Sequence, residues 1–191
     1  MADEPNVTER QAKWFASVRA SLETSTGKSL EEWVTIAHTC PETAHRARLR
    51  WFKETHGLLQ NRASYVIDQA FGSSMPWQAP EALVDALWTD DASRTIYEAL
   101  DGAALALPGT VRTARKSYTA WSRTFQYAAA RPLKDGGAML GLAVAPEVDA
   151  RLEAPKNESW SERLKARTRL DSPAAVDGRI SELLRAAWEK A

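Results

Sequence analysis

The 191-residue sequence has little cysteine and histidine, with one Cys, at position 40, and three His. A single cysteine cannot form a disulfide within the chain, which excludes the disulfide-rich scaffolds typical of small secreted domains. No apolar run approaches the roughly 20 residues that a transmembrane helix requires, and the opening Met-Ala-Asp-Glu-Pro does not resemble a signal peptide. We therefore expect a cytoplasmic protein that does not enter the membrane.

The chain also lacks net charge, because 25 Lys and Arg balance 25 Asp and Glu. A neutral molecule has no long-range field to draw it to nucleic acid, so such a partner would need a local basic patch. The nine Gly and nine Pro are too few for a collagen-like chain or a disordered tail. The composition instead favours an ordinary globular chain of one or two domains, with eight Trp beside four Tyr and four Phe as its one oddity.

Capping signals and helical periodicity dominate the beginning of the chain. Ser29 and Glu32 are spaced as a capping box, in which each side chain satisfies a free backbone N–H at a helix start. Pro41 is typical of the first turn of a helix, and Gly72 is typical of a helix end. We predict an all-helical domain over residues 1–72.

The pattern changes after residues 73–80, which follow Gly72, are rich in Pro and Ser, and are predicted to be a linker. Two helical stretches then precede segments that alternate with period two, the pattern of half-buried strands. Ser172 and Pro173 indicate a last helix. Residues 81–191 are therefore predicted to form an α+β domain, in which a small, mainly antiparallel sheet packs against helices. The predicted strands are 117–122, 125–129, 139–144 and 163–170.

Two blocks of the sequence resemble known families of bacterial proteins. Residues 26–33 (TGKSLEEW), residues 50–57 (RWFKETHG) and Ala63 resemble the small helical domain-of-unknown-function family 4287. The chain departs from that family's pattern at Gln60 and Asn61, where a histidine-containing segment is expected. A second block resembles family 5655, which often follows the first, through Lys116, Phe125, residues 167–170, Asp177, Ile180, Trp188 and Ala191. The resemblance implies the order and the fold of two modules and almost nothing about their chemistry.

A ligand site is suggested by cations that lie beside aromatic side chains. Lys53 and His56 lie one helical turn apart, with Trp51 and Phe52 just before them. A cation beside aromatic rings can hold an acidic or aromatic ligand. Because pockets form preferentially at domain junctions, we predict a Trp-lined crevice there. Its candidate residues are Trp33, Trp51, Lys53, His56, Trp77 and Trp88. Alternatively, Lys53 is simply solvated and His56 ends a helix, where the dipole favours a cation.

A cationic sheet face is the second candidate surface. In residues 163–170 apolar side chains alternate with cations, and aromatic residues are interleaved with further basic residues before this segment. Such a platform suits single-stranded nucleic acid or another anion. Alternating cations also protect exposed strands, and acids such as Glu153, Glu158 or Glu162 could neutralise them. The candidate residues are Lys116, Arg123, Arg163, Lys165, Arg167 and Arg169.

Recognisable catalytic and metal-binding motifs are missing from the sequence. The spacing of His38, Cys40 and His45 matches no structural zinc pattern, and no nucleotide-binding or hydrolase motif occurs. We predict no metal, no cofactor and no catalytic residues, which favours a non-catalytic protein and leaves open an enzyme assembled from distant residues. The leading hypothesis is binding of a small organic or anionic ligand. Nucleic-acid binding is the alternative, a protein-interaction or stress accessory module is the third, and the oligomeric state is not predicted.

Overall fold

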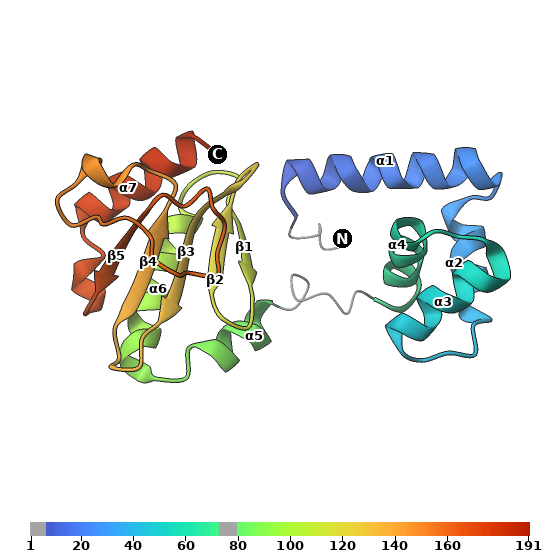
Figure 1. Ribbon diagram of the computed structural model, residues 1–191, viewed down its shortest axis with the longest axis horizontal. Helices are drawn as coiled ribbons and strands as arrows, with labels where there is room; N and C mark the ends of the chain where they lie inside the picture. Colours follow the sequence, from blue (N-terminus) through green and yellow to red (C-terminus); the bar gives the residue numbers. More distant parts are fainter. Residues whose placement is uncertain (1–6, 73–79) are drawn as a thin grey trace. The chain divides into compact units, whose positions relative to one another are not determined.

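The computed structural model describes residues 7–72 and 80–191 (Figure 1). The chain divides into two compact units. We call the described residues from Arg10 to Gly72 the helical unit and those from Pro80 to Ala191 the sheet unit. Each unit encloses its own cluster of buried apolar side chains. Within the described part of the chain, none of the helices combines the length and the apolar character that crossing a membrane needs.

Helices build the helical unit, and the predicted capping box begins one of them. The Ser29 hydroxyl accepts from the Glu32 backbone N–H at 3.2 Å, and the Glu32 carboxylate accepts from the Ser29 N–H at 2.7 Å. Gly57 and Gly72 follow two of the helices with positive φ angles of 65° and 75°, which glycine adopts readily. The helices are α1 Glu9–Thr26, α2 Leu30–His38, α3 His45–His56 and α4 Gln60–Phe71.

The start of α3 differs from the prediction made for Pro41. The helix begins at His45, after Ala44, which caps it without a side-chain hydrogen bond. The Cys40 N–H closes a turn after α2 by donating to the Ala37 carbonyl at 3.0 Å. The fixed φ of proline suits extended segments as well as first helical turns, so Pro41 does not locate the helix start.

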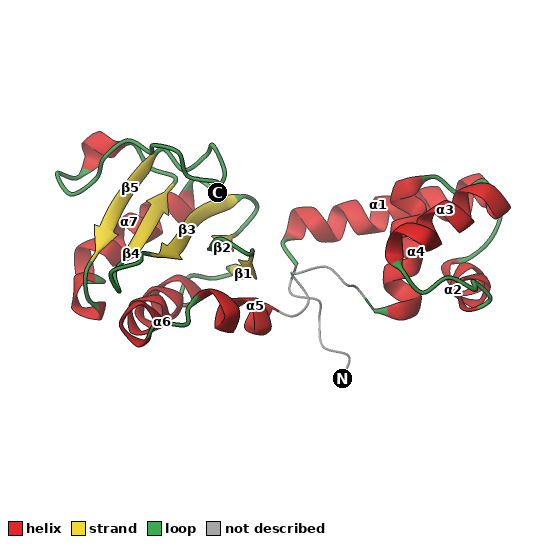
Figure 2. Ribbon diagram, turned by 60° about the horizontal axis from the view of Figure 1, so that its bottom comes forward, coloured by secondary structure: helices red, strands yellow, loops and turns green. Residues whose placement is uncertain are grey.

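A five-stranded sheet forms the centre of the sheet unit, with the strands in chain order and every neighbouring pair antiparallel. Three helices contribute to the core on one face of the sheet, which confirms the predicted α+β class (Figure 2). The strands are β1 Val111–Ala114, β2 Thr119–Ser122, β3 Gln126–Pro132, β4 Ala138–Leu142 and β5 Ala166–Leu170. The helices are α5 Pro80–Leu87, α6 Asp91–Leu105 and α7 Gly178–Glu189.

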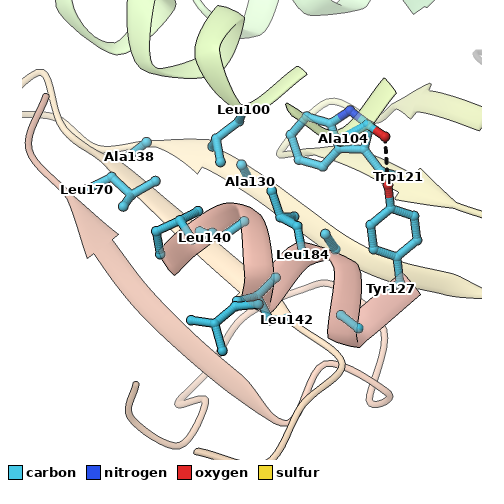
Figure 3. Close-up of a cluster of buried hydrophobic side chains, with 14 of the residues drawn as sticks. Leu100, Ala104, Trp121, Tyr127, Ala130, Ala138, Leu140, Leu142, Leu170 and Leu184 are labelled. Carbon is cyan, nitrogen blue, oxygen red and sulfur yellow. Dashed lines mark hydrogen bonds between the residues drawn. The ribbon is translucent and has the colours of Figure 1, made fainter. Parts of the chain in front are cut away.

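Large apolar side chains fill the space between the sheet and these helices. Leu140 and Leu142 of β4 meet Leu100 of α6 and Leu184 of α7 in one buried cluster (Figure 3). Tyr127 is fully buried, and its hydroxyl donates to the carbonyl oxygen of Ala104 at 3.3 Å. This core holds α7 against the sheet and thereby fixes the position of the C-terminal end of the helix.

The segment between β4 and β5 covers part of the opposite face of the sheet (Figure 1). Trp160 and Leu164 pack there on Ala129 and Met139. The indole of Trp160 lies so close to Gly141 that a Cβ at that position would be 2.8 Å from two ring carbons. This face is therefore partly covered and is not the open cationic platform that the sequence suggested.

Several strand boundaries in the sheet unit differ from those predicted, and one strand was missed. β1 was not predicted, and β5 begins at Ala166 because a turn precedes it, in which the Leu164 N–H donates to the Ser161 carbonyl at 3.0 Å. Pro173 opens a short 3-10 helix, η2 Pro173–Ala175, and not the last α-helix. α7 starts later, where the Asp177 carboxylate accepts from the Ile180 N–H at 2.8 Å.

Candidate functional site

Three of the residues predicted for the crevice lie together in the helical unit. The ring centroid of His56 is 4.7 Å from that of Trp51 and 5.7 Å from that of Trp33. Trp33 is only 4% exposed, and its indole N–H donates to the Thr26 hydroxyl at 2.9 Å. Lys53 is exposed and lines a hollow beside other cations of α3. The rings of this cluster thus contact one another, and the indole of Trp33 has its polar group satisfied within the unit.

The other two tryptophans of that prediction are not part of this cluster. Trp88 is 2% exposed in the core of the sheet unit, where it stacks on Tyr97 with ring centroids 5.1 Å apart. Its indole N–H donates to the Thr119 hydroxyl at 2.9 Å. Trp77 lies outside the described residues. Burial and a satisfied indole leave Trp88 little surface to offer a ligand, and the Trp-lined crevice stays a prediction.

Acidic residues neutralise the two cations that do lie on β5. Arg167 is 7% exposed and forms ion pairs with Glu153 at 3.0 Å and with Glu158. Burial is the largest single influence on the Glu158 carboxyl and by itself would raise its pKa. The hydrogen bonds from Arg167 and from backbone N–H groups, together with the charge of Arg167, outweigh burial, so this pKa is lowered. Arg169 pairs with Asp135 at 2.9 Å and with Asp171 at 2.6 Å. The predicted cationic face therefore has little unbalanced charge along this strand.

The other cations predicted for this face behave differently. Lys116 is exposed in the connection between β1 and β2. The Arg123 guanidinium lies over the indole of Trp188, 4.2 Å from its centroid. Arg163 and Lys165 fall in the turn before β5, and Leu164 between them is buried in the cluster under Trp160. Because the middle side chain points into that cluster, its two neighbours are free to project elsewhere.

Arg163 and Lys165 meet Lys190 at a small pocket, which we call the sheet-end pocket. Pairing of Leu142 with both Ala128 and Ala166 brings the start of β3, the end of β4 and the start of β5 to the same end of the sheet. Lys190 directly follows α7 and arrives there because the core holds that helix on the sheet. The pocket measures about 250 Å³ and is lined by Phe125, Gln126, Ala143, Arg163, Lys165, Lys190 and Ala191.

The cations of the sheet-end pocket have contacts of a different kind from those of Arg167 and Arg169. The Arg163 guanidinium lies 3.9 Å from the centroid of the Phe125 ring, so its contact is with an aromatic face. In the part of the chain that the structure describes, none of the ion pairs involves Arg163, Lys165 or Lys190. These side chains therefore differ from Arg167, a few residues away, whose charge is fully compensated.

Gln126 adds a polar group that lacks a partner. Its side-chain amide nitrogen is buried and has no hydrogen-bond acceptor among the described residues. A buried donor without an acceptor costs roughly 1–3 kcal/mol, so such groups are rare unless water or a ligand satisfies them. The pocket thus combines three cations that form no ion pair among the described residues with an N–H donor that lacks an acceptor, and such groups suit an anion.

The residues that sequence reasoning missed are Gln126 and Lys190, together with the ring of Phe125. Phe125 and Gln126 were expected as part of a strand and Phe125 also through the family resemblance, but no local pattern marks Phe125, Gln126 or Lys190 as site residues. Only the antiparallel register and the packing of α7 bring them together. Within residues 7–72 and 80–191, no group of three or more His, Cys, Asp or Glu side chains is placed to hold a metal ion.

Family comparisons match both parts of the chain. Residues 84–191 match the family described as "Domain of unknown function (DUF5655)", and residues 14–70 match "Domain of unknown function (DUF4287)". Both predicted resemblances are confirmed, in the predicted order. Neither a curated protein nor a solved structure matches the chain. The residues that line the sheet-end pocket all fall within the first of these matches.

Proposed function

Because the chain belongs to the DUF5655 family, whose description names no activity, we propose a function from the geometry of the matched unit itself. We propose that the protein is a non-catalytic binding protein that holds a small anion in the sheet-end pocket. The observation that carries this proposal is the meeting of Arg163, Lys165 and Lys190, none of which has a carboxylate partner among the described residues, with the unsatisfied amide of Gln126. The ligand class is the one expected from the sequence. Arg163 and Lys165 were candidates on the predicted cationic face, whereas Lys190 and Gln126 were not predicted.

The charge pattern supports an anion as the ligand. An ionised oxygen near Lys165 and Lys190 would accept charge-assisted hydrogen bonds, which are about twice as strong as bonds between neutral groups. A further ligand oxygen would give the Gln126 amide the acceptor that it lacks among the described residues. Binding would therefore remove two unfavourable features of the ligand-free pocket, its uncompensated charge and its unpaired donor.

The size of the pocket supports a small ligand. Its volume of about 250 Å³ lies below the range of roughly 300–1,000 Å³ that is usual for drug-sized molecules. A phosphate group or a short carboxylate matches this size. The ring of Phe125, already covered by Arg163, forms one apolar wall.

Titration calorimetry on the full chain tests this proposal with inorganic phosphate and with short dicarboxylates as probes. The double variant Lys165→Gln/Lys190→Gln removes two charge-assisted hydrogen bonds, each worth about 1.5–3 kcal/mol, so at least one anion should bind more than tenfold more weakly. The double variant Lys116→Gln/Lys134→Gln is the control, because it removes the same charge at exposed sites outside the pocket. Equal loss of binding in both variants, or no binding of any probe to the native chain, would contradict the proposal.

A further inference from the structure

A second group of cations lies in the helical unit, on one face of α3. Arg46, Arg50 and Lys53 follow one another at spacings of four and three residues, which places them on the same side of the helix. All three are exposed, and together with Leu49, Glu54 and Gln60 they line a hollow of about 640 Å³. We call Arg46, Arg50 and Lys53 the α3 cation stripe.

The members of the α3 cation stripe have no ion-pair partner within residues 7–72 and 80–191. Other arginines of the helical unit are engaged. Arg19 pairs with Glu23 at 3.2 Å and with Glu31 at 3.1 Å. Arg48, between the stripe residues in sequence, donates to the Glu42 carbonyl at 2.9 Å and lies 3.5 Å over the ring of Phe71.

The charge of the stripe is not offset by the unit around it. Residues 10–72 contain nine Lys and Arg against six Asp and Glu, whereas residues 80–191 contain sixteen of each. The molecule as a whole is neutral, so the excess of positive charge is local to the helical unit. Glu54 is the acid that lines the hollow, and it pairs with none of the three cations in the described structure.

We propose that the α3 cation stripe is a contact surface for the phosphate backbone of duplex nucleic acid. An α-helix rises about 1.5 Å per residue, so the stripe extends roughly 10 Å along the helix axis. That length exceeds one phosphate or carboxylate group and suits successive charges of a polyanion. A helix about 10–12 Å across also matches the roughly 12 Å width of the major groove of B-DNA.

The composition of the hollow favours a polyphosphate over an acidic protein. Leu49 is the one apolar side chain among those that line it, and that side chain is half-buried. Apart from Leu49, the apolar surface of the hollow comes from the stems of charged and polar side chains, and not from a cluster of apolar residues of the kind that forms the core of protein interfaces. Contacts with phosphates need only exposed, flexible cations and carry no sequence information, so binding at the stripe is independent of base sequence.

Fluorescence anisotropy of a labelled 20-base-pair DNA duplex with the full chain tests this proposal. Three phosphate contacts predict a slope of about −2.7 in the logarithm of the association constant against the logarithm of salt concentration. The triple variant Arg46→Gln/Arg50→Gln/Lys53→Gln should bind at least tenfold more weakly at 50 mM salt and should bring that slope close to zero. Far-UV circular dichroism checks that the exposed substitutions leave the helices intact.

Two control variants separate this inference from the proposed function. Lys116→Gln/Lys134→Gln/Lys156→Gln removes the same charge elsewhere, and Lys165→Gln/Lys190→Gln removes two cations of the sheet-end pocket; both should bind the duplex as the native chain does. A dissociation constant weaker than about 10⁻⁴ M at low salt, worse than typical non-specific binding, would overturn the proposal. An unchanged slope in the triple stripe variant, or tighter binding of poly-glutamate than of the duplex, would overturn it as well.

Discussion

Burial raises the pKa of two tyrosine hydroxyls in the sheet unit. Burial raises the pKa of Tyr127 to about 12, although the hydrogen bond with the Thr110 hydroxyl at 3.1 Å opposes this. Burial and the charge of Asp101 likewise raise the pKa of Tyr97 to about 12. The unfolded chain ionises near pH 10. The neutral phenols therefore contribute stability that is fully present below about pH 10 and is lost as the pH rises through about 12.

Ultraviolet titration of the phenolate band measures this shift directly. The native chain should show phenol ionisation near pH 12, and the Tyr127→Phe variant should show a smaller absorbance change there because only Tyr97 remains. The free energy of unfolding, measured with urea, should fall between pH 10 and pH 12. Appearance of the Tyr127 phenolate near pH 10 in the folded chain would mean that water reaches this hydroxyl.

At the same scale, Arg163 and Arg167 show how far single residues can be assigned from sequence. Both belong to one alternating run, and the pattern correctly indicates that acids such as Glu153 and Glu158 can neutralise such cations. It does not indicate which cations they neutralise, because that depends on the path of the segment between β4 and β5. Gln126 carries no local signal at all, since its missing acceptor is a property of the folded surroundings.

Among the elements, the segment that crosses the outer face of the sheet depends on a glycine in β4. Gly141 leaves room for Trp160, which is 8% exposed, and an added Cβ would lie 2.8 Å from the indole. Overpacking of this kind costs roughly 1–3 kcal/mol, so the Gly141→Ala variant should unfold at lower urea concentration. Gly102 in α6 is the control, because a Cβ there meets nothing within 4 Å and alanine favours a helix interior.

The Gly102→Ala variant should accordingly be as stable as the native chain or about 0.5–1 kcal/mol more stable. If Gly141→Ala unfolded at the same urea concentration as the native chain, the close packing of Trp160 on β4 would be wrong. The sign of the difference between these two variants isolates contact with the indole from the general effect of replacing glycine.

Elements were predictable from sequence where their signals are local. The capping box of Ser29 and Glu32 lies within four consecutive residues and is found as expected. β1 (VRTA) has four residues and, unlike β2, no aromatic side chain to mark it as a strand, and it pairs along its length with β2. Pro41 and Pro173 both precede helical turns without opening the α-helix predicted at each, because proline restricts its own φ and does not determine whether the next residues are helical.

On the scale of the whole molecule, the two units have separate apolar cores, and this predicts separate unfolding. Phe52 is fully buried in the helical unit, and Leu184 is fully buried in the sheet unit. Truncation to alanine costs about 3–5 kcal/mol for Phe and about 2–5 kcal/mol for Leu. Phe52→Ala should therefore lower the melting temperature of the helical unit while amide NMR signals of residues 80–191 stay dispersed. Leu184→Ala should lower the melting temperature of the sheet unit while the amide signals of residues 10–72 stay dispersed. Loss of all signals together in either variant would show one cooperative core.

The central claim, an anion held by the sheet-end pocket, is tested most directly at the side chain whose missing acceptor supports it. The full chain, labelled with ¹⁵N, is titrated with inorganic phosphate while the side-chain amide signals of Gln126 are followed by NMR. We predict that these signals move and reach saturation, and that they stay fixed in the Lys165→Gln/Lys190→Gln variant. If they did not move at about 10 mM phosphate, tenfold above a dissociation constant of ~1 mM, the pocket would not be a phosphate site. The same null result with short dicarboxylates would contradict the account.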